Sequence, residues 1–163
     1  MKNHLFKQAT STCKQNLHNM EDQPLVVEQL LNAPVPKVWK ALTDKEEMKN
    51  WYFQLEEFKA QVGFSFSFSA GPPQRQYLHL CEVTEVIPEK KLTYSWRYDG
   101  YPGNSFVTFE LFEQGSKTLL RLTHTALETL PQENTDFARQ NFQQGWDEIV
   151  HTSLRNYVEK KGL

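Results

Sequence analysis

The chain has 163 residues and a formal net charge of −2 at neutral pH, and aromatic residues make up 13% of it. This length suits one domain with a sizeable core. The near-balanced charge argues against a nucleic-acid-binding protein, which normally presents a strongly basic face. So many large rings must either pack a core or line a cavity.

The first part of the chain, residues 1–23, is polar and shows no sustained periodicity, so we expect a flexible leader. Residues 24–163 then form the domain. The start of the chain lacks the apolar core of a signal peptide, and no stretch is apolar for long enough to span a bilayer. A cytoplasmic protein is therefore expected. Cys13 lies in the leader and Cys81 in a predicted strand, so no disulfide framework is expected.

The domain is expected to begin with one strand and two short helices. Residues 25–31 are rich in branched apolar side chains, which predicts a strand. Residues 35–42 switch to helical spacing, and Pro36 suits the first turn of a helix. Asp44 provides an N-cap for a second helix that ends near Trp51.

The middle of the chain repeats strand patterns separated by turn signals. Between Gly63 and Ser69, Phe alternates with Ser, so that the rings share one face. The expected strands cover residues 54–59, 63–69, 75–87, 92–97, 106–113 and 117–126. Their short connections predict an antiparallel sheet rather than βαβ units.

The last stretch, residues 136–160, predicts one long α-helix of about 37 Å. Its apolar positions recur at spacings of three and four: Phe142, Trp146, Ile149, Val150, Leu154, Tyr157 and Val158. Gly145 lies among them, although glycine inside a helix costs about 1 kcal/mol relative to alanine. We therefore expect another element to approach the helix closely beside Trp146. Together these patterns predict an α+β fold in which a curved antiparallel sheet wraps around the long helix.

Three stretches resemble the START-like superfamily: Ala33–Asp44 with Trp51, Thr118–His124, and Gly145–Val150 with Leu154. They are most similar to the domain found in activators of the 90-kDa heat-shock protein ATPase, and the resemblance covers about residues 24–161. The matched packing positions are Trp39, Trp51, Gly145 and Trp146. The resemblance implies the helix-grip fold, with a cavity between sheet and helix that holds lipids, hormones or polyketides in relatives. It carries over no catalytic signature, and the separate chaperone-contacting domain of the eukaryotic activators has no counterpart in this sequence.

His79 is the strongest candidate for a chemically useful side chain. It shares one strand face with Tyr77, Cys81 and Val83 if no bulge intervenes, and it is a hydrogen-bonding or acid–base group near neutral pH. The alternative is a histidine that simply packs or faces solvent. No further ligands accompany His79 and Cys81, so no metal is expected. For His124 we expect a hydrogen-bonded structural role. The sequence also lacks phosphate-binding and dinucleotide-binding loops and a nucleophile elbow, so no cofactor or catalytic residue is predicted.

We expect a small apolar or amphipathic molecule to enter near Trp51 and to lie between sheet and helix. The expected ligand-binding residues are Trp51, Phe66, Phe68, His79, Tyr94, Trp96, Phe109, Phe142, Trp146 and Ile149. Ordinary core packing is the alternative for the aromatic members of this set. Two other functions remain open: a co-chaperone-like module that stimulates the 90-kDa heat-shock protein ATPase through its surface, and a cyclase- or hydrolase-like enzyme that uses the same cavity.

Overall fold

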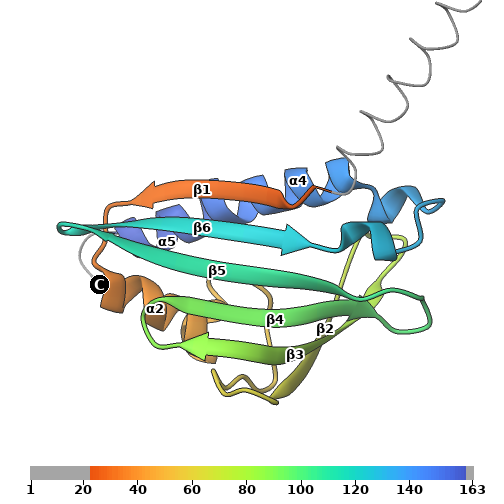
Figure 1. Ribbon diagram of the computed structural model, residues 1–163, viewed down its shortest axis with the longest axis horizontal. Helices are drawn as coiled ribbons and strands as arrows, with labels where there is room; N and C mark the ends of the chain where they lie inside the picture. The colour runs from red at the N-terminus through yellow and green to blue at the C-terminus, as the bar shows by residue number, and fades with distance from the viewer. Residues whose placement is uncertain (1–22, 161–163) are drawn as a thin grey trace, which may run out of the picture.

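The computed structural model describes residues 23–160 (Figure 1). Apart from Gln23, the leader expected over residues 1–23 lies outside the described residues. The strands are β1 (Leu25–Leu31), β2 (Ser65–Ala70), β3 (Tyr77–Ile87), β4 (Lys91–Tyr98), β5 (Ser105–Gln114) and β6 (Lys117–Thr125). The helices are α2 (Val35–Thr43), α3 (Lys45–Met48), the 3-10 turns η1 (Leu127–Thr129) and η2 (Thr135–Phe137), α4 (Arg139–Asp147), the π-helical η3 (Glu148–Leu154) and α5 (Arg155–Glu159).

The strands form one antiparallel sheet in the order β1-β6-β5-β4-β3-β2. The continuous rod of α4, η3 and α5 crosses one face of this curved sheet, and α2 and α3 close one end (Figure 1). The α+β helix-grip architecture predicted from the sequence is therefore confirmed. None of the helices within residues 23–160 is long and apolar enough to cross a membrane.

The strand alternation places the core as predicted. In β5, Val107, Phe109 and Leu111 are buried against the helix, while Glu110 lies on the other face. In β3, the side chains from Tyr77 to Val83 keep a strict alternation, because the β-bulge lies beyond them, between Val83 and Glu85. His79 therefore shares one face with Tyr77, as expected, and the structure shows that this face points inward.

The C-terminal helix differs from the predicted regular α-helix, because η3 is π-helical. The buried side chains of the rod form a stripe and are spaced by four residues: Trp146, Val150, Leu154 and Val158. In an α-helix each step of four residues turns the side chain about 40° away from the previous one. A wider π-helical turn takes up this drift. The stripe thus stays in contact with the sheet over the whole rod.

The close approach expected at Gly145 is wrong. Apart from the neighbouring residues and the backbone of its own helix, a Cβ atom at Gly145 would have no heavy atom of the described residues within 4 Å, and the residue lies on the exposed side of α4. Its carbonyl and that of Gln144 share the backbone N–H of Glu148, where the helix changes from α to π. The position of the glycine coincides with this change in the hydrogen-bond ladder, and no packing contact explains it.

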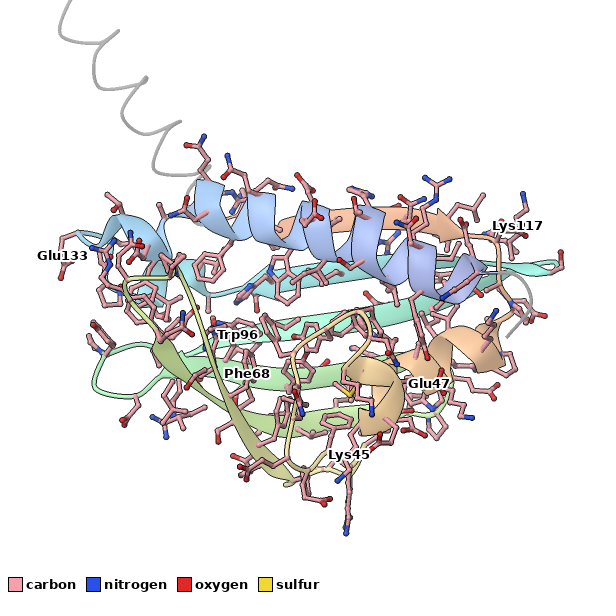
Figure 2. The ribbon with its side chains drawn as sticks, turned by 180° about the vertical axis from the view of Figure 1, so that it is seen from behind. Lys45, Glu47, Phe68, Trp96, Lys117 and Glu133 are labelled. Carbon is pink, nitrogen blue, oxygen red and sulfur yellow. The ribbon has the colours of Figure 1, made fainter. Side chains whose placement is uncertain are left out.

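The strand expected over residues 54–59 is also wrong. Residues 52–64 form an irregular segment, here called the covering segment, that crosses the helix side of the sheet (Figure 2). Leu55 and Phe58 are both buried, and this spacing of three is incompatible with the two-residue period of a strand. Lys45 fixes the segment from α3 by donating from Nζ to the Glu56 carbonyl at 2.9 Å.

Candidate functional site

The concave face of the sheet carries a group of rings, here called the aromatic cluster: Phe68, His79, Trp96 and Trp146. Phe68 and His79 are cross-strand partners on β2 and β3, and their rings stack with centroids 4.4 Å apart. Trp96 of β4 lies edge-on to His79 at 4.9 Å, and Trp146 of α4 closes the cluster 5.5 Å from Trp96. Phe68 and Trp96 are labelled on the helix side of the sheet in Figure 2.

The cluster is covered by two rings of the covering segment. Phe53 stacks on Phe68 with centroids 4.3 Å apart and an interplanar angle of 17°. Tyr52 lies nearly parallel to Trp146 at 6.3 Å, and its hydroxyl is 2.6 Å from that of Tyr94. Both covering rings are only half-buried. The aromatic cluster is thus closed by an irregular segment and not by a helix or strand.

His79 is a neutral hydrogen-bonding group in this setting. Its Nδ1 atom lies 2.9 Å from the carbonyl of Tyr77, which only accepts, so Nδ1 carries the proton and Nε2 is left as an acceptor. Burial lowers the pKa of His79 to about 4, and the backbone carbonyls of Tyr77 and Phe68 oppose this in part. At neutral pH the ring is therefore uncharged, and its Nε2 atom can accept a hydrogen bond.

A hollow of about 100 Å³ adjoins His79 at the β2–β3 end of the sheet. Its lining residues are Ala70, Gly71, Pro72, Tyr77, His79, Tyr98, Asp136 and Phe137. Tyr77 donates its hydroxyl to Asp136 at 2.5 Å, and Arg75 forms two hydrogen bonds to the same carboxylate. The hydrogen bonds from Tyr77 and Arg75 lower the pKa of Asp136. The hollow therefore combines aromatic and apolar lining residues with one charged, hydrogen-bonded carboxylate, that of Asp136.

The loop beside this hollow requires glycine at position 71. Its φ of +150° is disfavoured for other residues, and a Cβ would lie 2.4 Å from the carbonyl oxygen of Arg75.

His124 has the structural role that the sequence predicts. Trp146 donates from Nε1 to His124 Nδ1 at 3.0 Å, so the proton of the neutral ring is on Nε2, which lies 2.9 Å from Ser105 Oγ. Ser105 in turn donates to the carbonyl of Trp96 at 2.7 Å. Burial lowers the pKa of His124 to about 3. Both ring nitrogens are engaged, which leaves neither free for a ligand.

The remaining residues predicted to bind a ligand lie around the aromatic cluster. Phe66, Tyr94 and Phe109 form a second group, in which the ring centroid of Tyr94 lies 5.1 Å from that of Phe66 and 6.0 Å from that of Phe109. Trp51 is buried, donates from Nε1 to the carbonyl of Ala41 at 2.9 Å, and stacks on Tyr52. Phe142, beside His124, and Ile149 are half-buried on the helix.

Sequence reasoning missed four residues at this site: Tyr52, Phe53, Tyr98 and Asp136. The run Trp51-Tyr52-Phe53 at the end of α3 is a local signal that points to the first two. Asp136 carries no such signal, because its partners Arg75 and Tyr77 lie about 60 residues earlier in the chain.

Two larger depressions lie outside the space between sheet and helix. One, of about 310 Å³, is lined by Ser65, Phe66, Ser67, Leu80, Cys81, Glu82, Ser95 and Arg97. The other, of about 330 Å³, is lined by Pro34, Val35, Pro36, Pro88, Glu89, Lys90, Leu111, Glu113 and Gly115. Burial raises the pKa of the Cys81 thiol, so this cysteine is not an activated nucleophile. Among residues 23–160, no group of three or more His, Cys, Asp and Glu side chains is placed to hold a metal ion.

Residues 32–159 match the family model described as Activator of Hsp90 ATPase homolog 1-like protein. The chain belongs to this family. A search of curated proteins finds no match.

Solved structures agree with the family assignment. Protein MLL2253 from Mesorhizobium loti is 27% identical with a TM-score of 0.67, and the match covers 86% of this chain and 100% of that one. Protein BH1534 from Bacillus halodurans is 26% identical with a TM-score of 0.66, over 84% and 97% of the two chains. The Aha1 dimer from Colwellia psychrerythraea is 22% identical with a TM-score of 0.65, over 86% and 99%, which shows a shared fold.

Proposed function

We propose that this family member binds a small hydrophobic or amphipathic molecule on the concave face of the sheet, under the C-terminal helix. The observation that carries the proposal is the way in which the aromatic cluster is closed. Tyr52 and Phe53 cover it from an irregular segment, and both rings are half-buried. Loop segments open at lower cost than helices and strands, so this cover is the natural route to the cluster.

The cluster offers the two kinds of contact that such a ligand needs. Burial of apolar surface against Phe68 and Trp96 contributes about 25 cal/mol per Å², before the cost of ordering the ligand. His79 supplies an uncharged acceptor at the side of the cluster, next to the hollow. Of the predicted ligand-binding residues, we assign the contacts first to the aromatic cluster. Tyr94 is buried, and its hydroxyl becomes accessible only when Tyr52 moves, because the two hydroxyls are hydrogen-bonded.

Native mass spectrometry of the protein purified from its own host tests the proposal. A co-purifying adduct of a few hundred daltons is expected. The matched variants are Phe68→Ser, which breaks the cluster, and Leu30→Ser, which changes a side chain on β1 that is 45% exposed. Loss of the adduct with the first change alone supports the site. An adduct that survives Phe68→Ser, or no adduct from the native host, contradicts it.

The family match favours a second function, a co-chaperone-like module that acts on the 90-kDa heat-shock protein ATPase. Such a module uses its surface and tolerates a filled interior. Val26 and Leu30 of β1 are 46% and 45% exposed, which makes this strand a testable contact surface. ATPase stimulation that is abolished by Leu30→Ser and unaffected by Phe68→Ser would favour the module over the binding protein. A cyclase- or hydrolase-like enzyme would instead need two converging polar groups, for which His79 and Tyr98, whose ring centroids are 4.6 Å apart, are the pair to test.

A further inference from the structure

Phe53 is placed against the aromatic cluster as a bound ring would be. Its ring is nearly parallel to that of Phe68 at 4.3 Å, and its centroid is 6.2 Å from that of His79. This is the offset stacked geometry that aromatic pairs prefer. A half-buried residue of an irregular segment thus stacks on the Phe68 ring, which also stacks with His79.

The residues on either side of Phe53 anchor the covering segment, whereas Phe53 has no such anchor. Trp51 and Tyr52 are fixed by hydrogen bonds to Ala41 and Tyr94, respectively. Leu55 and Phe58 are buried, with 6% of each side chain exposed. Within residues 23–160, no backbone–backbone hydrogen bond involves Phe53. The Phe53 ring is therefore able to swing away while its neighbours stay anchored.

We propose that Phe53 is an internal stand-in for a ligand's aromatic ring, and that the site takes planar aromatic molecules, which bind by displacing it. This inference rests on the proposed function and specifies its ligand class. The face of Phe68 that Phe53 covers, with Trp96 edge-on at 5.6 Å from Phe68, matches a flat ring better than a flexible alkyl chain. The acceptor nitrogen of His79 and the adjoining hollow of about 100 Å³ suit a ring that carries a hydroxyl or N–H donor.

Calorimetric titration with 2-naphthol, an aromatic donor, tests the inference on the full chain. The ligand must displace Phe53 in the wild type, so Phe53→Ala is expected to bind 2-naphthol about tenfold more tightly, the size of effect that loss of one stacked pair gives. Phe112→Ala is the matched control, because it removes a partly buried ring from the other face of β5, where the Arg121 guanidinium lies 4.9 Å from the ring centroid. It is expected to leave the affinity unchanged.

A second variant and a second probe make the outcome decisive. Phe53→Leu keeps apolar volume and the fold but removes the stack, and a gain of a few-fold is expected. Decanoate, an aliphatic probe, is expected to gain less than 2-naphthol from either change. Equal 2-naphthol affinity of the wild type and both Phe53 variants would overturn the stand-in role while leaving the proposed function intact. An equal gain for decanoate would overturn the aromatic class, and absence of binding by all variants would overturn the inference altogether.

Discussion

Trp146 and His124 join the C-terminal helix to the sheet through one buried hydrogen bond, from the indole Nε1 to Nδ1 across 3.0 Å. Both side chains are at most 2% exposed. The bond also selects the tautomer of His124, which lies 2.9 Å from Ser105 and through it is linked to the backbone of β4. Helix and sheet are thus held in register by a chain of polar contacts inside an apolar interior.

The first prediction concerns this bond. Trp146→Phe removes the donor and leaves His124 Nδ1 buried without a partner, and it also removes ring volume from the core. Both effects destabilise the fold, by about 2–4 kcal/mol together. Urea unfolding followed by circular dichroism measures the loss. The control is Trp39→Phe, at a half-buried tryptophan whose expected cost is under about 1 kcal/mol. Equal losses for the two variants would show that the bond to His124 does not stabilise the fold.

The second prediction concerns acid sensitivity. The folded-state pKa of His79 is about 4, below the ordinary value of 6.5, because burial disfavours the charged ring. The unfolded chain therefore binds more protons as the pH falls below 6.5, and the free energy of unfolding decreases until the pH reaches the folded pKa. Between pH 7 and pH 5 the loss from His79 is about 2 kcal/mol. His124, with a pKa of about 3, loses a similar amount.

His79→Phe isolates one of these two contributions. Chemical unfolding at pH 7 and pH 5 is expected to show a fall in stability that is smaller by about 2 kcal/mol than in the wild type. His79→Phe also leaves the Tyr77 carbonyl without its partner, which changes the stability at pH 7, so the difference between the two pH values is the quantity to compare. An unchanged pH dependence would mean that His79 is not buried in the neutral form.

The third prediction uses the two glycines that differ most in their surroundings. At Gly145 an added Cβ meets open space, so Gly145→Ala is expected to stabilise the fold by about 0.5–1 kcal/mol. At Gly103 the φ is +102° and a Cβ would lie 2.2 Å from the Thr129 carbonyl oxygen, so Gly103→Ala is expected to destabilise it. Thermal unfolding compares the two directly. A destabilised Gly145→Ala variant would indicate that the change from α to π helix needs a glycine.

Much of the fold is readable from the sequence because each strand has one buried face. The alternation of Val107, Phe109 and Leu111 fixes which side of β5 packs on the helix, and no later contact overrides it. The π-helical part of the rod also leaves a trace in the sequence. Its buried residues Trp146, Val150, Leu154 and Val158 are spaced by four, and a regular α-helix would turn such a row gradually away from the sheet. The apolar spacing by itself, however, predicts an ordinary amphipathic α-helix.

The candidate site is less readable, because its contacts join parts of the chain far apart in sequence. The covering segment has no period of its own, so the stacking of Phe53 on Phe68 follows from where α3 ends and not from local propensity. The same holds for Asp136, which receives Arg75 and Tyr77 only after β3 and η2 are brought together. The two histidines illustrate this limit. The strand pattern places both His79 and His124 among apolar residues. Only the structure shows that His79 lies beside a hollow, whereas both ring nitrogens of His124 are hydrogen-bonded.

The most direct test of the binding site is the set of indole N–H signals in a ¹H–¹⁵N NMR titration with 2-naphthol. The chain has four tryptophans, and each signal is assigned with a Trp→Phe variant. Trp96 lies edge-on to Phe68 and His79, so its signal is expected to shift on addition of the ligand, while that of Trp39, outside the cluster, stays in place. A saturating ligand that moves Trp39 and leaves Trp96 unchanged would contradict a site on the concave face of the sheet.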